Sequence, residues 1–202
     1  MHMPTFLEHH RRAVEASVEV VRTIGVADLG RATPCAEWDL AELVAHMTAQ
    51  HHGFAAAARG HGADLDVWRT EPIADAVAAD PGGTYAAAAR DVLDAFATEG
   101  LDDAAFALPE FGADVTVPGA LAMGFHFVDY VVHGWDVAAS LGQTYSLPAD
   151  VVAAALPIAL GVPDGEMRDA GNSPFARAVA PGDTDDELAR ILRHLGRDPD
   201  GA

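Results

Sequence analysis

Residues 118–142 read PGALAMGFHFVDYVVHGWDVAASLG and carry the strongest signal for the fold class. It predicts one long helix, because Pro118 suits a first turn and Leu141–Gly142 suits an end, with mostly apolar residues between them. At about 100° per residue, Asp129 and His133 lie about 40° apart on one face of this helix. His126 falls on the same stripe, one further turn back. A carboxylate and one or two imidazoles therefore project together from an otherwise apolar helix, as expected for the core or a cavity of a bundle.

Helical patterns recur on both sides of this stretch, and alternating β-branched runs are scarce. Three capping patterns indicate helix starts: Thr5-x-x-Glu8, Asp39-x-x-Glu42 and Thr184-x-x-Glu187. The further predicted helices cover about residues 5–24, 39–60, 84–99, 148–161 and 184–195.

The segments between these helices are irregular. Residues 60–72 are predicted as a loop, 114–117 as a short extended piece, and 163–182 as a long connection rich in Gly, Pro, Asn, Ser and Asp. We therefore expect an all-α fold, a four-helix bundle with extra short helices and a long irregular C-terminal connection. Nothing in the pattern asks for a second domain within residues 1–202.

Composition excludes several classes of function. The chain of 202 residues has 31 acidic and 12 basic residues and a formal charge of −19, so nucleic acid and anionic membranes are unlikely partners. All basic residues are Arg, which removes lysine-dependent chemistry. The single Cys35 excludes an intrachain disulfide and a thiolate-rich metal site. No signal peptide and no membrane-spanning run is recognised, so a cytoplasmic protein is expected.

The stripe on the long helix suggests a metal site. Charged groups and imidazoles are costly in an apolar interior unless they are paired or bind a cation, and His nitrogen with Asp oxygen suits an ion such as Zn²⁺. His46, in the middle of the second predicted helix, is the best candidate for a third ligand beside Asp129 and His133. Three protein ligands leave a position for water or substrate, which is the catalytic arrangement.

Simpler interpretations of the same residues remain open. Asp129 and His133 can form an ordinary i,i+4 pair on a solvated face, and a histidine inside a helix is more often hydrogen-bonded than metal-bound. Trp135 and Asp136 are candidates to contact a metal-bound His133 on the side away from the metal, where Asp136 can accept its other ring N–H. For Trp135, and also for Trp38, core packing is the favoured interpretation. Cys35 is expected to be a packing residue. His9, His10, His51, His52 and His61 are expected on faces or in loops, with His9 and His51 as candidates to line the same cavity.

Three blocks of sequence resemble one family. They are residues 33–46 (TPCAEWDLAELVAH), residues 131–138 (VVHGWDVA), and residues 175–180 followed by 188–197. Together they are similar to the N-terminal domain of mycothiol-dependent maleylpyruvate isomerase, within the DinB/YfiT-like metalloenzymes. This resemblance implies a four-helix bundle that holds a divalent metal, most often zinc or nickel, by two histidines and a carboxylate.

Carried onto this chain, the resemblance places the metal ligands at His46, Asp129 and His133. The isomerase has Glu where this sequence has Asp129, which is shorter by one methylene group. His126 is therefore kept as the alternate ligand, and a water molecule as a further alternative.

The resemblance implies chemistry with a metal-activated low-molecular-weight thiol, as an S-transferase or isomerase acting on a small-molecule electrophile. The isomerase has an additional C-terminal domain, so maleylpyruvate isomerisation itself is not expected of this chain. A non-catalytic protein that binds a metal or small ligand, for example in stress or sensing, and a metal-dependent hydrolase are the alternatives. A homodimer through the apolar helix faces is also left open.

Overall fold

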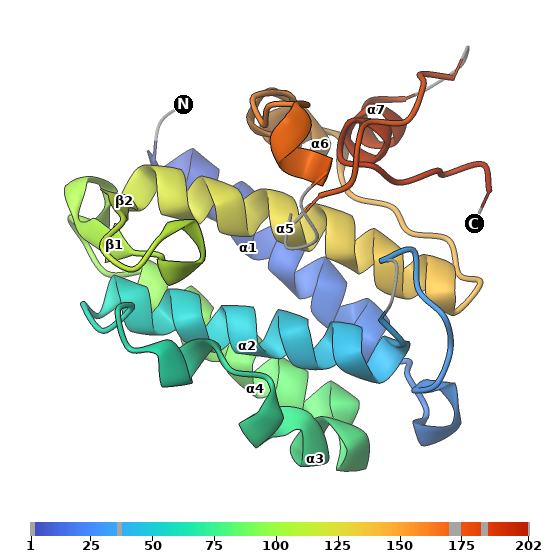
Figure 1. Cartoon of the computed structure of the whole chain (residues 1–202), viewed down its shortest axis with the longest axis horizontal. Coiled ribbons are helices and arrows are strands. Elements are labelled where there is room, and N and C mark those ends of the chain that lie inside the picture. Colours follow the sequence, from blue (N-terminus) through green and yellow to red (C-terminus); the bar gives the residue numbers. More distant parts are fainter. Residues whose placement is uncertain (1–2, 36–37, 170–174, 183–185, 202) are drawn as a thin grey trace.

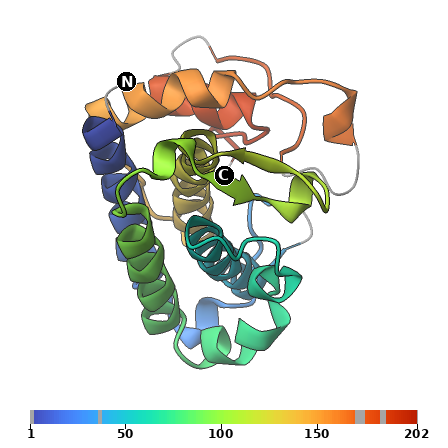
Figure 2. The ribbon, with the colours of Figure 1, turned by 90° about the vertical axis from the view of Figure 1, so that its left-hand side faces the viewer.

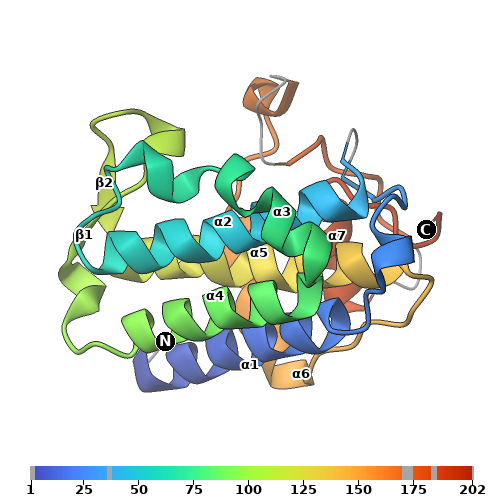
Figure 3. The same ribbon diagram turned by 90° about the horizontal axis from the view of Figure 1, so that it is seen from below.

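The computed structural model describes residues 3–35, 38–169, 175–182 and 186–201. Within them four long helices lie side by side as a bundle, seen from the side in Figure 1 and nearly end-on in Figure 2. They are α1 (Met3–Val21), α2 (Leu40–Ala58), α4 (Pro81–Phe96) and α5 (Gly119–Ser140). From below, α1 and α4 lie next to each other, and α2 lies on the other side of α4 with α5 behind it (Figure 3). The prediction of an all-α bundle with extra short helices is confirmed.

Two further helices cover one side of this bundle. Helix α6 (Ala149–Leu160) packs on α1 and α5, and α7 (Glu187–His194) packs on α6 (Figure 1). The remaining short elements are η1 (Val26–Asp28), η2 (Leu65–Trp68), α3 (Glu71–Ala79), η3 (Leu101–Asp103), η4 (Pro109–Phe111) and η5 (Glu166–Asp169). Strands β1 (Ala105–Ala107) and β2 (Thr116–Pro118) pair antiparallel, with Ala105 opposite Pro118. No helix in the described ranges is long and apolar enough to cross a membrane.

The capping patterns in the sequence predicted the start of α2 correctly and the start of α1 wrongly. Asp39 caps α2: its side chain accepts a hydrogen bond from Glu42 N at 2.9 Å, and the Glu42 carboxylate accepts from Asp39 N at 3.0 Å. Helix α1 begins at Met3, so Thr5 lies inside the helix and the predicted cap there is wrong. Thr184 lies outside the described residues, and α7 begins after Asp186, whose side chain accepts from Ala189 N at 2.8 Å.

The predicted loop at residues 60–72 is partly helical, and the sequence signal for this was missed. Trp68 at the end of η2 donates a hydrogen bond from Nε1 to Gly62 O at 2.8 Å. Its indole ring lies against Gly53 so closely that a methyl group on Gly53 would overlap it. The contact of Trp68 with α2 therefore gives this segment a defined structure, although its turn-forming residues predicted an irregular loop.

Helix α5 is the central element of the bundle, and most of its residues are buried. This position explains its nearly continuous apolar sequence, because a helix covered on all sides shows no polar face. After α5 the chain folds back so that Tyr145 contacts Gly134, where any side chain would overlap the tyrosine hydroxyl. Glycine in the His-Gly-Trp-Asp segment thus allows close packing of the returning chain.

Candidate functional site

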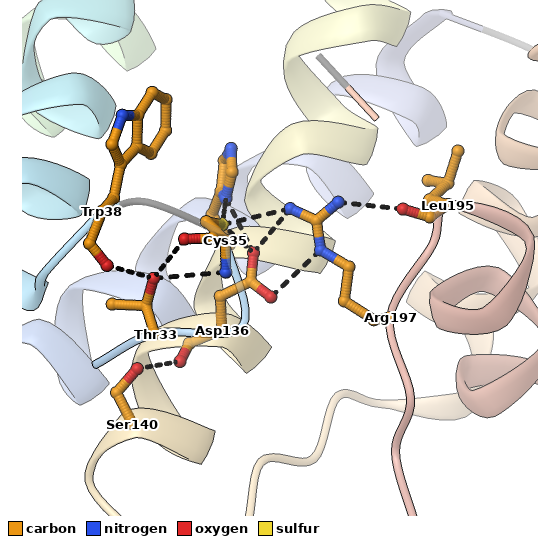
Figure 4. A network of polar contacts seen from close by, with 8 residues as sticks. Thr33, Cys35, Trp38, Asp136, Ser140, Leu195 and Arg197 are labelled. Atoms are coloured by element: carbon orange, nitrogen blue, oxygen red, sulfur yellow. Dashed lines mark hydrogen bonds and ion pairs between the residues drawn. The ribbon is translucent and has the colours of Figure 1, made fainter. Parts of the chain in front are cut away.

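A buried polar cluster lies where the start of α2 meets the second half of α5 (Figure 4). At its centre is Asp136, whose exposed fraction is 0%. Its Oδ2 accepts hydrogen bonds from His133 Nδ1 at 2.9 Å and from Cys35 Sγ at 3.1 Å. Arg197 reaches the same carboxylate from the C-terminal segment, with Nε 3.2 Å from Oδ1 and Nη2 3.0 Å from Oδ2. Three side chains from three parts of the chain thus donate to one carboxylate.

Local structure positions Cys35 and Trp38 beside this cluster. The hydroxyl oxygen of Thr33 lies 3.0 Å from Cys35 O and 2.9 Å from Trp38 O, and it accepts a hydrogen bond from Cys35 N at 3.2 Å. Asp136 and His133 need no such help, because residues three apart in a helix are neighbours on its surface. Ser140 donates to the backbone carbonyl of Asp136 at 2.8 Å (Figure 4).

The charges in this cluster stabilise one another. Burial alone would raise the pKa of Asp136, but the charge of Arg197 and the hydrogen bond and charge of His133 lower it to about 2. Burial likewise opposes the charged form of His133, but its hydrogen bonds to Asp136 and Cys35 raise its pKa to about 10. Asp136 is therefore ionised throughout the neutral range, and a cation that binds His133 must displace a proton from the ring.

His46 from α2 lies against the outer side of His133. The two rings are 5.5 Å apart between centroids and meet edge to face, and the ring of Trp38 covers His46 at 4.6 Å. Burial, and then the nearby charge of His133, lower the pKa of His46 to about 3. His46 is therefore neutral at neutral pH, which is the form of imidazole that binds metal ions. No hydrogen bond joins its ring nitrogens to another described residue.

Asp129 lies one turn before His133 on α5 and is partly buried. Burial raises the pKa of its carboxyl, and the charges of His133 and Arg197 oppose that shift. No hydrogen bond or ion pair connects this carboxylate to any residue in the described part of the chain. One turn beyond His46, the side-chain oxygen of Gln50 is also buried without a partner.

The chemistry of His46, Asp129 and His133 fits a bound divalent cation, because two imidazoles and a carboxylate suit such an ion. Near them the oxygen of Gln50 is buried without a partner, whereas buried polar groups are normally satisfied. The structure brings the two histidines together, but the ligand atoms of all three residues do not lie within 4.8 Å of one another. Among the described residues that criterion is met by Cys35, His133 and Asp136. Arg197 already binds the latter site, and its positive charge disfavours a second cation there.

His126, the alternate ligand, belongs to a different cluster. Its Nδ1 lies 2.8 Å from His10 Nε2, and its Nε2 lies 3.2 Å from His51 Nδ1, so both of its ring nitrogens already have partners. The expectation that His10 and His51 lie on faces or in loops is wrong, because both are fully buried. Their imidazoles bond through His126 and pack on aromatic rings, and His51 is stacked on Tyr130 at 4.1 Å.

The two residues expected to support His133 differ in their surroundings. Asp136 holds the ring directly, whereas Trp135 is partly buried against the hydrophobic core. Core packing of Trp38 was a wrong expectation, because that residue is 37% exposed and contacts His46. Sequence reasoning also missed the polar role of Cys35 and the whole contribution of Arg197, for which no local pattern exists.

The fold is an all-α helical bundle, and comparison with known sequences identifies its family. Residues 10–138 match the family of the mycothiol maleylpyruvate isomerase N-terminal domain, and the chain belongs to that family. The match includes His46, Asp129, His133 and Asp136, and it ends before α6, α7 and Arg197.

Other known proteins are similar to this chain in sequence or in fold. Two relatives from Mycobacterium tuberculosis, the uncharacterized protein Rv0738 of strain H37Rv and the uncharacterized protein MT0763 of strain CDC 1551, are each 31% identical over 170 residues. The alignment covers 83% of this chain and 84% of each relative. The crystal structure of the mycothiol-dependent maleylpyruvate isomerase shares the fold, with a TM-score of 0.56 at 12% identity over 76% of this chain and 68% of that chain.

Proposed function

We propose that this protein is a metal-dependent enzyme that uses a low-molecular-weight thiol, as an S-transferase or isomerase, on a small-molecule electrophile in the cytoplasm. In this proposal His46, Asp129 and His133 hold a divalent cation, zinc first and nickel as the alternative. The observation that carries it is the His133 ring, whose Nδ1 is bonded to buried Asp136 at 2.9 Å while the ring of His46 lies 5.5 Å away. Metal-bound histidines nearly always donate their other N–H to such an acceptor.

The donor set supports a catalytic rather than a structural centre. Two imidazoles and one carboxylate leave at least one position for solvent or substrate. His46 is already neutral, and Asp129 offers a carboxylate that no described side chain neutralises. Trp38 covers one side of His46 and is itself exposed, so this side of the candidate site carries an apolar ring at the surface.

When bound, a divalent cation would lower the pKa of a coordinating thiol, so that the sulfur reacts as a thiolate near neutral pH. The protein contributes the geometry. Asp136 keeps a proton on His133 Nδ1 and fixes the ring, and Asp129 supplies negative charge that balances a cation. Asp129 is shorter than Glu by one methylene group, so its carboxylate would reach less far from α5 toward a bound cation.

The electrophile determines which of two reactions the sulfur undergoes, a transfer or an isomerisation. The thiol loses its proton to solvent and its sulfur forms a bond to an electrophilic carbon; in a transfer, a leaving group departs with the bonding electrons. In an isomerisation, the sulfur adds to a conjugated double bond, the resulting single bond rotates, and the same thiolate leaves. Because the solved structure with this fold is described as mycothiol-dependent, mycothiol is the first thiol to test.

Metal content tests the site directly. We expect purified protein to bind close to one equivalent of zinc, and His46→Ala and His133→Ala each to lose most of it. His61→Ala is the matched control, because His61 lies on an exposed loop. Retention of stoichiometric metal by the double variant His46→Ala/His133→Ala would refute the assignment of the ligands.

Thiol dependence tests the reaction. The zinc-loaded protein is mixed with mycothiol, glutathione or cysteine and with alkylating electrophiles or maleylpyruvate, and loss of free thiol or change in double-bond geometry is followed. Turnover that requires one thiol and disappears in His133→Ala supports the proposal. If the zinc-loaded protein shows no turnover with any thiol but hydrolyses esters or amides, the thiol-dependent function is refuted and a metal-dependent hydrolase takes its place.

A further inference from the structure

Arg197 enters the candidate site from a part of the chain that the family match does not include. It follows α7, and its side chain is buried with an exposed fraction of 5%. The guanidinium donates to both oxygens of Asp136, to Cys35 Sγ at 3.2 Å and to Leu195 O at 2.9 Å (Figure 4). Its contacts therefore connect the C-terminal segment with α5 and with the loop before α2.

The two bonds from Arg197 to Asp136 fix the plane of that carboxylate. A planar guanidinium binds a carboxylate through two nearly parallel hydrogen bonds, which removes rotation as well as adding energy. With Oδ1 and Oδ2 held in this way, Oδ2 stays 2.9 Å from His133 Nδ1. Without Arg197, Asp136 would be a buried charge with only Cys35 and His133 as donors, and it could rotate or take up a proton.

We propose that Arg197 is a positioning residue for His133, so that the C-terminal segment completes the metal centre formed by the bundle. Arg197 fixes Asp136, Asp136 fixes the Nδ1 proton and ring orientation of His133, and the free Nε2 is thereby aimed at the cation. The inference rests on the proposed function for the cation, while the positioning of His133 can be measured without it.

If Arg197 only held the C-terminal segment in place, another buried arginine of that segment would have the same effect on the site when replaced. Arg168 is such an arginine and serves as the matched control. Arg168 is also a buried arginine, with an exposed fraction of 7%. It donates to the carbonyls of Val162, Pro163, Ala176 and His194, and therefore holds the same C-terminal region without touching the site. Loss of packing in this region would affect Arg168→Met and Arg197→Met alike, whereas loss of positioning would affect only Arg197→Met.

The experiment measures Co²⁺ and Zn²⁺ affinity of the full chain by titration, with the Co²⁺ absorption spectrum as a report of ligand geometry. We expect Arg197→Met to weaken binding by about 10–100-fold, which is the usual effect of losing a partner behind a metal ligand, and to alter the spectrum. Arg197→Lys keeps the charge but not the paired bonds, so its metal affinity should lie between those of Arg197→Met and wild type. Arg168→Met should bind within about 3-fold of wild type, well below that effect.

A second readout does not depend on metal. In the metal-free protein, the hydrogen-bonded Nδ1 proton of His133 should give a downfield NMR resonance that persists in Arg168→Met and Arg197→Lys and disappears in Arg197→Met. If Arg197→Met keeps this resonance and binds metal as wild type does, the positioning role is overturned although the metal proposal stands. If wild type shows the resonance but binds no metal, the proposed function fails, and loss of the resonance in Arg197→Met still supports the positioning of His133.

Discussion

Acidification should destabilise this fold through the imidazoles buried between α1, α2 and α5. His10 is fully buried, and desolvation lowers its pKa from 6.5 to about 3. Between these two values the unfolded chain binds a proton at this side chain and the folded chain does not, so stability is present above the unfolded pKa and falls as the pH falls. The same sign holds for His51 and His126, whose pKa values burial also lowers well below 6.5.

The size of the effect follows from the two pKa values of His10. Proton linkage gives a loss of about 2 kcal/mol from this residue between pH 7 and pH 5, and of about 5 kcal/mol at most below pH 3. Since the whole stability of a domain is only about 5–15 kcal/mol, one buried imidazole is a substantial part of it.

Replacement of His10 by Phe removes this titrating group and also its hydrogen bond to His126, so the change of stability with pH is compared and not its absolute value. Phe titrates no proton and suits the neighbouring rings of Phe96 and Phe127, 5.2 and 6.3 Å from the imidazole. Urea unfolding of metal-free protein, followed by circular dichroism at pH 7, 6 and 5, should show a loss about 2 kcal/mol smaller in His10→Phe than in wild type. His61→Ala, an exposed histidine, is the control. An equal loss in wild type and His10→Phe would refute the neutral, buried state of His10.

Three further variants test packing and capping by thermal unfolding. Gly53→Ala should lower stability by about 1–3 kcal/mol, because its methyl group would overlap the ring of Trp68. Gly124→Ala, also inside a long helix, finds its nearest neighbour at 3.7 Å and should raise stability by up to about 1 kcal/mol. Equal shifts in Tm for these two alanines would contradict the packing. Asp39→Ala removes the cap of α2 and should cost about 1 kcal/mol, and a wild-type Tm would show that the cap contributes nothing.

Where the signal was local, the sequence predicted the fold well. The cap at Asp39 and the apolar run of α5 depend on residues within a few positions of each other, and both are found in the structure. Element η2 was missed because its order depends on Trp68 meeting α2, a contact that turn-forming residues do not reveal, and α3 is held by packing on α2 and α4.

The candidate site shows the same division. Spacing along α5 was enough to place Asp129 and His133 on one face, and their role as metal ligands stays a prediction. The partners of Asp136 depend on packing across the molecule, because 61 residues separate it from Arg197 and 101 separate it from Cys35. A similar limit applies to His10 and His126, which lie 116 residues apart and meet only once α1 packs on α5.

The contact between Cys35 and Arg197 also has a consequence for the order of folding. It spans 162 residues, and contacts that close such long loops cost more entropy than the local contacts of helices, so they form late. During synthesis, α1 to α5 leave the ribosome before Arg197 does, and they can pack while Asp136 still lacks its bonds to Arg197. We therefore expect a newly made bundle to pass through a stage in which His46 and His133 are in place. In that stage the buried carboxylate of Asp136 does not yet have the charge of Arg197 beside it. Docking of the last segment then ends that stage.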